Sequence, residues 1–132
     1  MIIDTNVYSA FNRGSTEAIE ILKKCQQIFL CTPVLGELKA GFMGGSRFEE
    51  NERNLDKLLA NANVNVLDIG LATTRVYADL TVFAKKKGRA LSNNDIWIAA
   101  LALENNLPLA TFDKDFDVFT EKFGDNLIIL KG

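Results

Sequence analysis

Histidine is absent from the 132 residues of this chain, and its absence excludes several classes of enzyme at once. Without histidine there is no Ser-His-Asp or Cys-His catalysis, no imidazole acid–base chemistry, and little scope for the usual zinc sites. The two cysteines, Cys25 and Cys31, match no zinc or redox spacing, so buried and reduced thiols are expected. If the chain is an enzyme, carboxylates must therefore carry its chemistry.

The chain also lacks long apolar runs and an excess of positive charge. No segment approaches the roughly 18 apolar residues of a membrane helix. Met1 leads directly into Ile2 and Ile3 rather than into a basic leader, so a soluble, cytoplasmic protein without membrane contact is expected. The net charge is −2, so nucleic-acid binding would need a local basic patch or a bound cation. The 48% share of apolar residues suffices for one domain over residues 1–132.

What is present is an alternation of short apolar runs with amphipathic segments. Helix starts are indicated by Ser15, by Thr32-Pro33, by a capping box of Ser46 and Glu49, and by Ser92. The predicted helices run over residues 16–25, 32–43, 46–59, 71–87 and 92–105, with a short helical turn in DKDFDVF. The predicted strands cover residues 2–4, 28–31, 64–69, 107–112 and 127–130.

Strands that alternate with helices predict an α/β fold made of βαβ units. The expected architecture has three α/β/α layers, with helices on both faces of a mainly parallel sheet of four or five strands. Sites in such sheets form beyond the carboxyl ends of the strands. Asp4 ends the first predicted strand and Asp113 follows the fourth, so both are expected at that edge.

Most of the 17 acidic residues fit solvated positions, but a few do not. Glu37 lies in the largely apolar helix PVLGELKAGF, where pairing with a nearby lysine is the ordinary alternative. Asp95 lies in the first turn of NNDIWIAALALE, where compensation of the helix dipole would also explain it. Asp113, Asp115 and Asp117 crowd one turn, and helix capping accounts for only one of them.

Carboxylates that converge from separate segments repel one another and raise one another's pKa, and a divalent cation would relieve this repulsion. Oxygen ligands without histidine or cysteine favour Mg²⁺ or Mn²⁺ over zinc. A cation would also compensate Asp4, whose charge follows a buried strand. Such a site could polarise a phosphate and generate hydroxide, so hydrolysis of phosphodiesters is the chemistry it suits.

As a set, these motifs resemble those of PIN-domain ribonucleases, above all the VapC-type toxins of toxin–antitoxin pairs. The resemblance lies in DTN after the first strand, a glutamate in the helix after the second strand, NDIWIAALAL and LATFDKDF, and it spans essentially the whole chain. It implies a PIN-like fold whose acidic quartet holds Mg²⁺ or Mn²⁺ directly or through water. That quartet is Asp4, Glu37, Asp95 and Asp113, with Asp4 and Asp95 favoured as direct ligands.

The resemblance also implies an activity and partners. An activated water would attack a phosphodiester of structured RNA, of the tRNA or rRNA class, and the protein would form a homodimer that binds a small antitoxin. Supporting site positions are implied at Thr5, Asn6, Asn94, Thr111 and, as a replacement or assistant for Asp113, Asp115. One departure is Asn93, because many relatives have aspartate there.

Contacts with the partners are less clearly indicated by the sequence. Lys85, Lys86, Lys87 and Arg89 could contact phosphates or could simply solubilise a helix end, and Arg13, Lys39 and Arg47 are further possible contacts. Trp97 and Phe112 could stack on bases, but their apolar neighbours favour core packing. An apolar recess for the antitoxin could be formed by Phe42, Met43, Phe48, Leu55 and Leu58.

Two other readings stay open at this point. The first is a non-catalytic PIN-like module that binds RNA or protein; the intact quartet argues against it. The second is a receiver-like or phosphatase domain. Phosphatases of the aspartyl type need a second acidic residue where Asn6 stands. Receivers need an acidic pair after the first strand, which this chain lacks, although Asp68 could mimic their phosphoacceptor.

Overall fold

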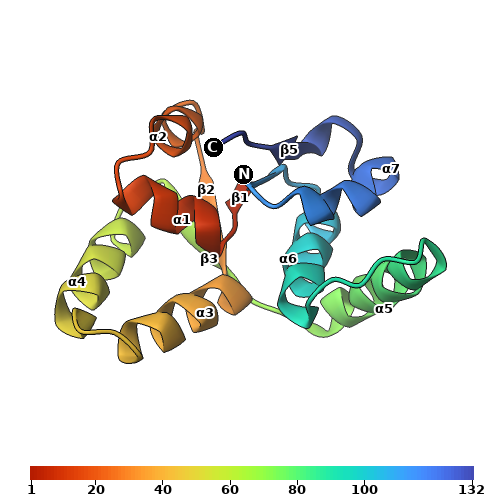
Figure 1. Cartoon of the computed structure of the whole chain (residues 1–132), viewed down its shortest axis with the longest axis horizontal. Coiled ribbons are helices and arrows are strands. Elements are labelled where there is room, and N and C mark those ends of the chain that lie inside the picture. Colours follow the sequence, from red (N-terminus) through yellow and green to blue (C-terminus); the bar gives the residue numbers. More distant parts are fainter.

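Five short strands form one central sheet in the computed structural model, which describes residues 1–132 (Figure 1). The strands are β1 (Ile2–Ile3), β2 (Ile28–Cys31), β3 (Val64–Leu67), β4 (Leu109–Thr111) and β5 (Leu127–Ile129). Their order is β3-β2-β1-β4-β5, and every neighbouring pair is parallel. The predicted parallel sheet is therefore confirmed.

Helices connect each strand to the next and cover both faces of the sheet. They are α1 (Thr5–Asn12), α2 (Thr16–Lys23), α3 (Thr32–Met43), α4 (Phe48–Leu59), α5 (Leu71–Lys86), α6 (Asn93–Glu104) and α7 (Thr120–Phe123), with the 3₁₀ segments η1 (Lys114–Phe119) and η2 (Gly124–Asn126). Helices α1 to α4 lie on one side of the strands and α5 to α7 on the other (Figure 1). The expected three-layer α/β/α arrangement is confirmed.

The order of the strands reverses between β1 and β4, which lie side by side at the centre of the sheet. Ile2 pairs with Leu109 and Ile3 with Ala110. Successive connections run from β1 outward to β3, and then cross back over the sheet to β4 and β5. The segments that leave β1 and β4 therefore diverge at their carboxyl ends, and such a switch point leaves an opening in which ligands bind.

A cluster of 29 buried apolar residues forms the core and fixes the elements around this opening. Ile2, Ile3, Leu109 and Ala110 are fully buried, as expected for central strands covered on both faces. Helix α6 is buried along most of its length, from Ile96 through Ala102 except for Trp97, which is partly exposed. No membrane-spanning helix is found among the helices.

The main difference from the predicted elements lies directly after β1. The sequence pattern predicts a strand as far as Asp4 and no helix before Ser15, but β1 ends at Ile3 and α1 begins at Thr5. Asp4 is the N-cap of α1, and its Oδ1 accepts a hydrogen bond from the backbone N–H of Val7 at 3.0 Å. The misassignment arose because an Asp that ends a strand and an Asp that caps a helix look alike in sequence.

The predicted helix caps were partly correct. Ser15 and Ser92 are N-caps whose hydroxyls accept backbone N–H groups, of Ala18 at 3.4 Å and of Asp95 at 3.1 Å. The predicted capping box of Ser46 and Glu49 is wrong, because α4 begins at Phe48 behind Arg47, which makes no side-chain cap. Thr32 also makes no cap, since Cys31 occupies that position.

Candidate active site

Four carboxylates from distant parts of the chain line one small hollow at the switch point. The hollow has a volume of about 50 Å³, and its lining residues are Asp4, Thr5, Asn6, Glu37, Asp95, Ile98 and Asp113. The structure thus gathers all four members of the predicted quartet, together with the predicted supporting residues Thr5 and Asn6. The topology explains the gathering, because α1, α3 and η1 begin at the carboxyl edge and α6 runs back from it to the start of β4.

Asp4 is 5% exposed, and its carboxylate is held from two sides. Its Oδ1 accepts the N–H of Val7 at the start of α1, and its Oδ2 accepts the hydroxyl of Thr111 at 2.5 Å. A helix N-terminus carries partial positive charge, so α1 stabilises this buried anion. The charge that follows β1 is therefore compensated in part by the helix that the sequence pattern did not predict.

Glu37 reaches the hollow from α3. Its Oε1 accepts a hydrogen bond from the Thr5 hydroxyl at 3.2 Å, which links α3 to the first residue of α1. The ordinary alternative, pairing with a nearby lysine, is not seen. The neighbouring Lys39 instead pairs with Glu52 at 3.1 Å.

Asp113 lines the hollow and Asp115 does not. The N–H of Asp113 donates to Thr111 Oγ1 at 2.9 Å, and its Oδ1 accepts the N–H of Asp115 at 2.9 Å, so that Asp113 caps η1. Asp115 is exposed and lies 3.5 Å from the Arg89 guanidinium. Of the other supporting positions, Thr111 is fully buried beneath Asp4, and Asn94 follows the Asn93 that accepts the Tyr77 hydroxyl at 3.0 Å.

Burial and mutual repulsion both act on the carboxylates of Asp4 and Asp95. The pKa of Asp4 is raised above 3.8 mainly by burial and further by the charges of Asp95 and Asp113, and its hydrogen bonds only partly offset this. Burial likewise raises the pKa of Asp95, with the charges of Asp113 and Glu37 adding to it. The hollow is therefore a place where negative charge is unfavourable until a cation arrives.

The donor set of the hollow fits a hard divalent cation. All four candidate ligands are carboxylates, which suit Mg²⁺ or Mn²⁺. The one sulfur donor nearby, Cys31, is buried, and its pKa is raised to about 11, so it stays a thiol. As the side chains stand, no three Asp, Glu or Cys groups lie close enough together to hold a metal ion, so binding would require the carboxylates to turn inward.

Two features of the site had no clear signal in the sequence. Ile98, one turn after Asp95, gives the hollow its one apolar side chain; in sequence it looks like any core residue of α6. Arg89 lies 3.0 Å from Asp117 as well as near Asp115, and so neutralises the acidic turn beside the hollow. The run of aspartates before Phe119 could have suggested such a partner, but not which basic residue.

The raised pKa values predict how stability depends on pH in the absence of divalent ions. The folded state takes up protons on Asp4 and Asp95 at higher pH than the unfolded chain does, so acidification from neutrality should stabilise the fold until the ordinary value near 3.8 is reached. The urea midpoint in EDTA should be higher at about pH 5 than at about pH 7.

A double variant, Asp4→Asn with Asp95→Asn, is the control for this pH effect, because it lacks both raised groups. The wild type should gain more from acidification than the double variant does. Equal gains in the two proteins would contradict the assignment.

Comparisons of the sequence and of the structure with known proteins agree with one another. The family model described as PIN domain matches residues 1–122. "Ribonuclease VapC2" of Rickettsia felis is 31% identical over 114 residues, which are 83% of this chain and 84% of that protein. The solved structure of VapBC2 from Rickettsia felis, bound to a DNA fragment from their promoter, superposes with a TM-score of 0.77 at 28% identity, and the match covers 97% of this chain and 95% of that one. VapBC-1 of nontypeable Haemophilus influenzae gives 0.77 at 26% identity, with 91% and 92% covered.

Proposed function

The chain belongs to the PIN domain family, and on that premise we propose that it is a metal-dependent endoribonuclease, the toxin of a toxin–antitoxin pair. The observation that supports this most directly is the single hollow lined by Asp4, Glu37, Asp95 and Asp113 at the switch point of the sheet. The relatives named ribonuclease VapC align with this chain over most of their length. RNA phosphodiesters, of the tRNA or rRNA class, are the proposed substrate.

In this proposal the four carboxylates would hold Mg²⁺ or Mn²⁺, with Asp4 and Asp95 as direct ligands. The chemistry such an ion supplies is polarisation of a phosphodiester and acidification of a water molecule. The neighbouring residues hold the candidate ligands in place. Thr5 fixes Glu37 through its 3.2 Å hydrogen bond, and Thr111 fixes Asp4. Asn6 and Thr5 present polar groups to whatever occupies the hollow.

A cognate antitoxin is the proposed protein partner, because the solved relatives include VapBC2 and VapBC-1, and the solved VapBC-5 of Mycobacterium tuberculosis is described as a member of the VapBC family of toxin–antitoxin systems. The apolar recess predicted for it is only partly available. Phe42 and Leu55 belong to the core, whereas Met43 is 72% and Phe48 38% exposed at the turn between α3 and α4. A homodimer is also proposed; Val66 is 45% exposed in β3, the strand at one free edge of the sheet.

The test is cleavage of total RNA by the purified chain. We expect cleavage with Mg²⁺ or Mn²⁺, none in EDTA, and recovery when the ion is restored. Expression of the chain should arrest growth, and co-expression of its antitoxin should relieve the arrest.

A non-catalytic RNA- or protein-binding module is the second candidate, favoured by the carboxylates not yet standing at ligand distance from a common point. RNA binding without cutting at any concentration of Mg²⁺ or Mn²⁺ would support that candidate over the nuclease.

A further inference from the structure

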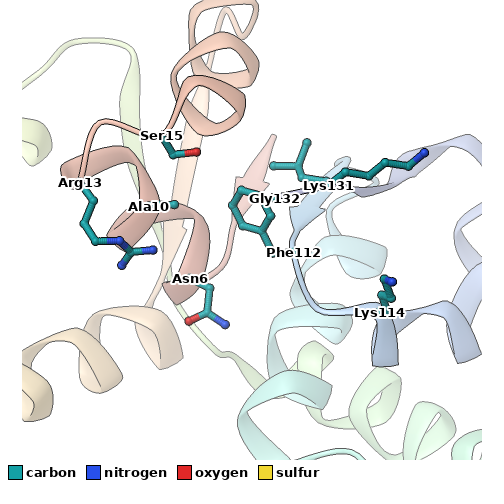
Figure 2. A pocket seen from close by; sticks show the side chains of 9 residues that line it. Asn6, Ala10, Arg13, Ser15, Phe112, Lys114, Lys131 and Gly132 are labelled. Carbon is teal, nitrogen blue, oxygen red and sulfur yellow. The ribbon is translucent and has the colours of Figure 1, made fainter.

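A larger groove opens directly beside the acidic hollow. Its volume is about 700 Å³, and it lies between α1 and the segments that follow β4 and β5. Asn6 lines both the groove and the hollow, and Lys114 in the groove follows Asp113 of the hollow in sequence. Figure 2 shows Arg13 at the end of α1 on one side, Phe112 and Lys114 on the other, and Asn6 between them. A chain leaving the hollow past Asn6 would therefore enter this groove.

The groove is positively charged, although the whole protein is not. Arg13, Lys114 and Lys131 line it, and no acidic side chain does. None of these three cations takes part in any ion pair of the structure. Their charges are thus available to an anion from outside. This is the local basic patch that a chain of net charge −2 needs if it is to bind nucleic acid.

Three of the other basic residues considered from the sequence, Lys39, Lys87 and Arg89, are already engaged in ion pairs. Lys87 lies 2.6 Å from Glu121, and Arg89 lies 3.0 Å from Asp117. A second depression near these residues is lined by both charge signs, including Asp117 and Glu121. Phosphates would have to displace these carboxylates there, whereas they meet no such competition in the groove.

Apolar side chains separate the charged ones in the groove. Phe112, which is half-buried, and Leu130 form an apolar wall, and Ala10 lines the groove from α1. Cations that flank an apolar, partly aromatic surface suit single-stranded nucleic acid, whose phosphates alternate with flat bases. An acidic peptide would satisfy the cations but would leave this wall without a matching group.

We propose that the groove binds the part of the RNA strand adjoining the scissile phosphate, with Arg13 and Lys114 contacting backbone phosphates and a base or ribose against Phe112. This inference rests on the proposed ribonuclease function and names the substrate-binding surface for it. The RNA is held there in single-stranded form, because a base can reach the apolar wall only when it is unpaired. Lys131, which also lines the groove, adds a third positive charge.

The test measures the salt dependence of binding to a labelled oligouridylate in EDTA, so that no cutting occurs. In the double variant Arg13→Gln with Lys114→Gln, the negative slope of log K against log salt should become shallower by about 1.4, at about 0.7 per lost phosphate contact on a single strand. The matched control is Arg53→Gln with Lys57→Gln, which removes the same charges from exposed positions on α4 outside the groove. The control should keep the wild-type slope.

The outcomes separate the groove from the nuclease. An unchanged slope in the groove variant, or no oligouridylate binding by the wild type, overturns the proposal that the groove binds RNA. Cleavage of total RNA by the wild type would then still support the proposed function. Polyglutamate serves as a second probe. If the groove variant loses binding to polyglutamate but keeps binding to oligouridylate, the proposal is also overturned, because the groove would then bind an acidic protein segment. If the slope depends on the groove residues but the protein cuts no RNA, the result supports RNA binding in the groove and rejects the ribonuclease function. Thermal melts confirm that each variant is folded.

Discussion

The Asp95→Asn variant is expected to lose RNA cleavage by at least about 100-fold, the scale on which single groups that stabilise transition-state charge act. Asp95 lies in the first turn of α6, and its pKa is raised by burial and by its acidic neighbours. Replacing this carboxylate with an amide removes a negative charge that the ion would need. The variant should also lose the rise in melting temperature that Mn²⁺ gives the wild type.

The same change should leave the fold intact, which makes the activity loss interpretable. Loss of a negative charge from a helix N-terminus costs about 0.3–1 kcal/mol, and relief of burial and repulsion opposes that cost. Asp56→Asn is the matched control, because Asp56 is an exposed carboxylate on α4 outside the hollow. Cleavage near the wild-type rate in Asp95→Asn, with melting unchanged, would exclude Asp95 from the catalytic site.

The overall fold could be predicted because its signals are local and repeated. Short apolar runs such as IFLC alternate with segments of helical spacing, and that alternation predicts a parallel sheet whatever the exact boundaries are. Ser15 and Ser92 could be recognised as caps because each stands directly before a helical apolar pattern. The strand order β3-β2-β1-β4-β5 could not be read in this way, since pairing depends on contacts between distant segments.

The candidate site was predictable as a set of residues but not as a geometry. Asp4 and Asp113 follow strands, so their place at the carboxyl edge follows from the parallel sheet. Glu37 and Asp95 stood out because each lies in a largely apolar helix, but each also had an ordinary explanation, and the family resemblance assigned them to the quartet. Only the structure shows that Asp113 rather than Asp115 lines the hollow.

The groove lies further from sequence-level prediction. Arg13, Lys114 and Lys131 come from three segments that share no pattern, and their common feature is the absence of an acidic partner. Of these three, the sequence indicated only Arg13 as a possible contact, and it drew attention chiefly to the run from Lys85 to Lys87, whose density of charge is evident. Partnering, which decides whether a cation is free to bind phosphate, depends on tertiary structure.

The Thr111→Val variant is expected to lose about 1–3 kcal/mol of unfolding free energy at neutral pH, the cost of leaving a buried polar group without its partner. Thr111 is fully buried, donates its hydroxyl to Asp4 Oδ2 at 2.5 Å and accepts the N–H of Asp113 at 2.9 Å. Valine has nearly the same shape but makes neither bond. Urea unfolding at neutral pH measures the loss, and Thr111→Ser, which keeps the hydroxyl, should recover most of the stability.

Thr111 positions Asp4 and does not itself touch the substrate, so a measurement besides stability must separate this role from support of the fold. Its hydrogen bond lowers the pKa of Asp4, against the larger effect of burial. Without that bond the pKa of Asp4 rises further, and because catalysis needs the carboxylate ionised, the loss of cleavage on acidification should begin at higher pH in Thr111→Val than in Thr111→Ser. At neutral pH the rate should fall by about 10–100-fold, as for other groups that orient metal ligands. A destabilised variant whose pH–rate profile matches that of the wild type would show that Thr111 supports the fold alone, and that the orientation of Asp4 is set by the N-terminus of α1.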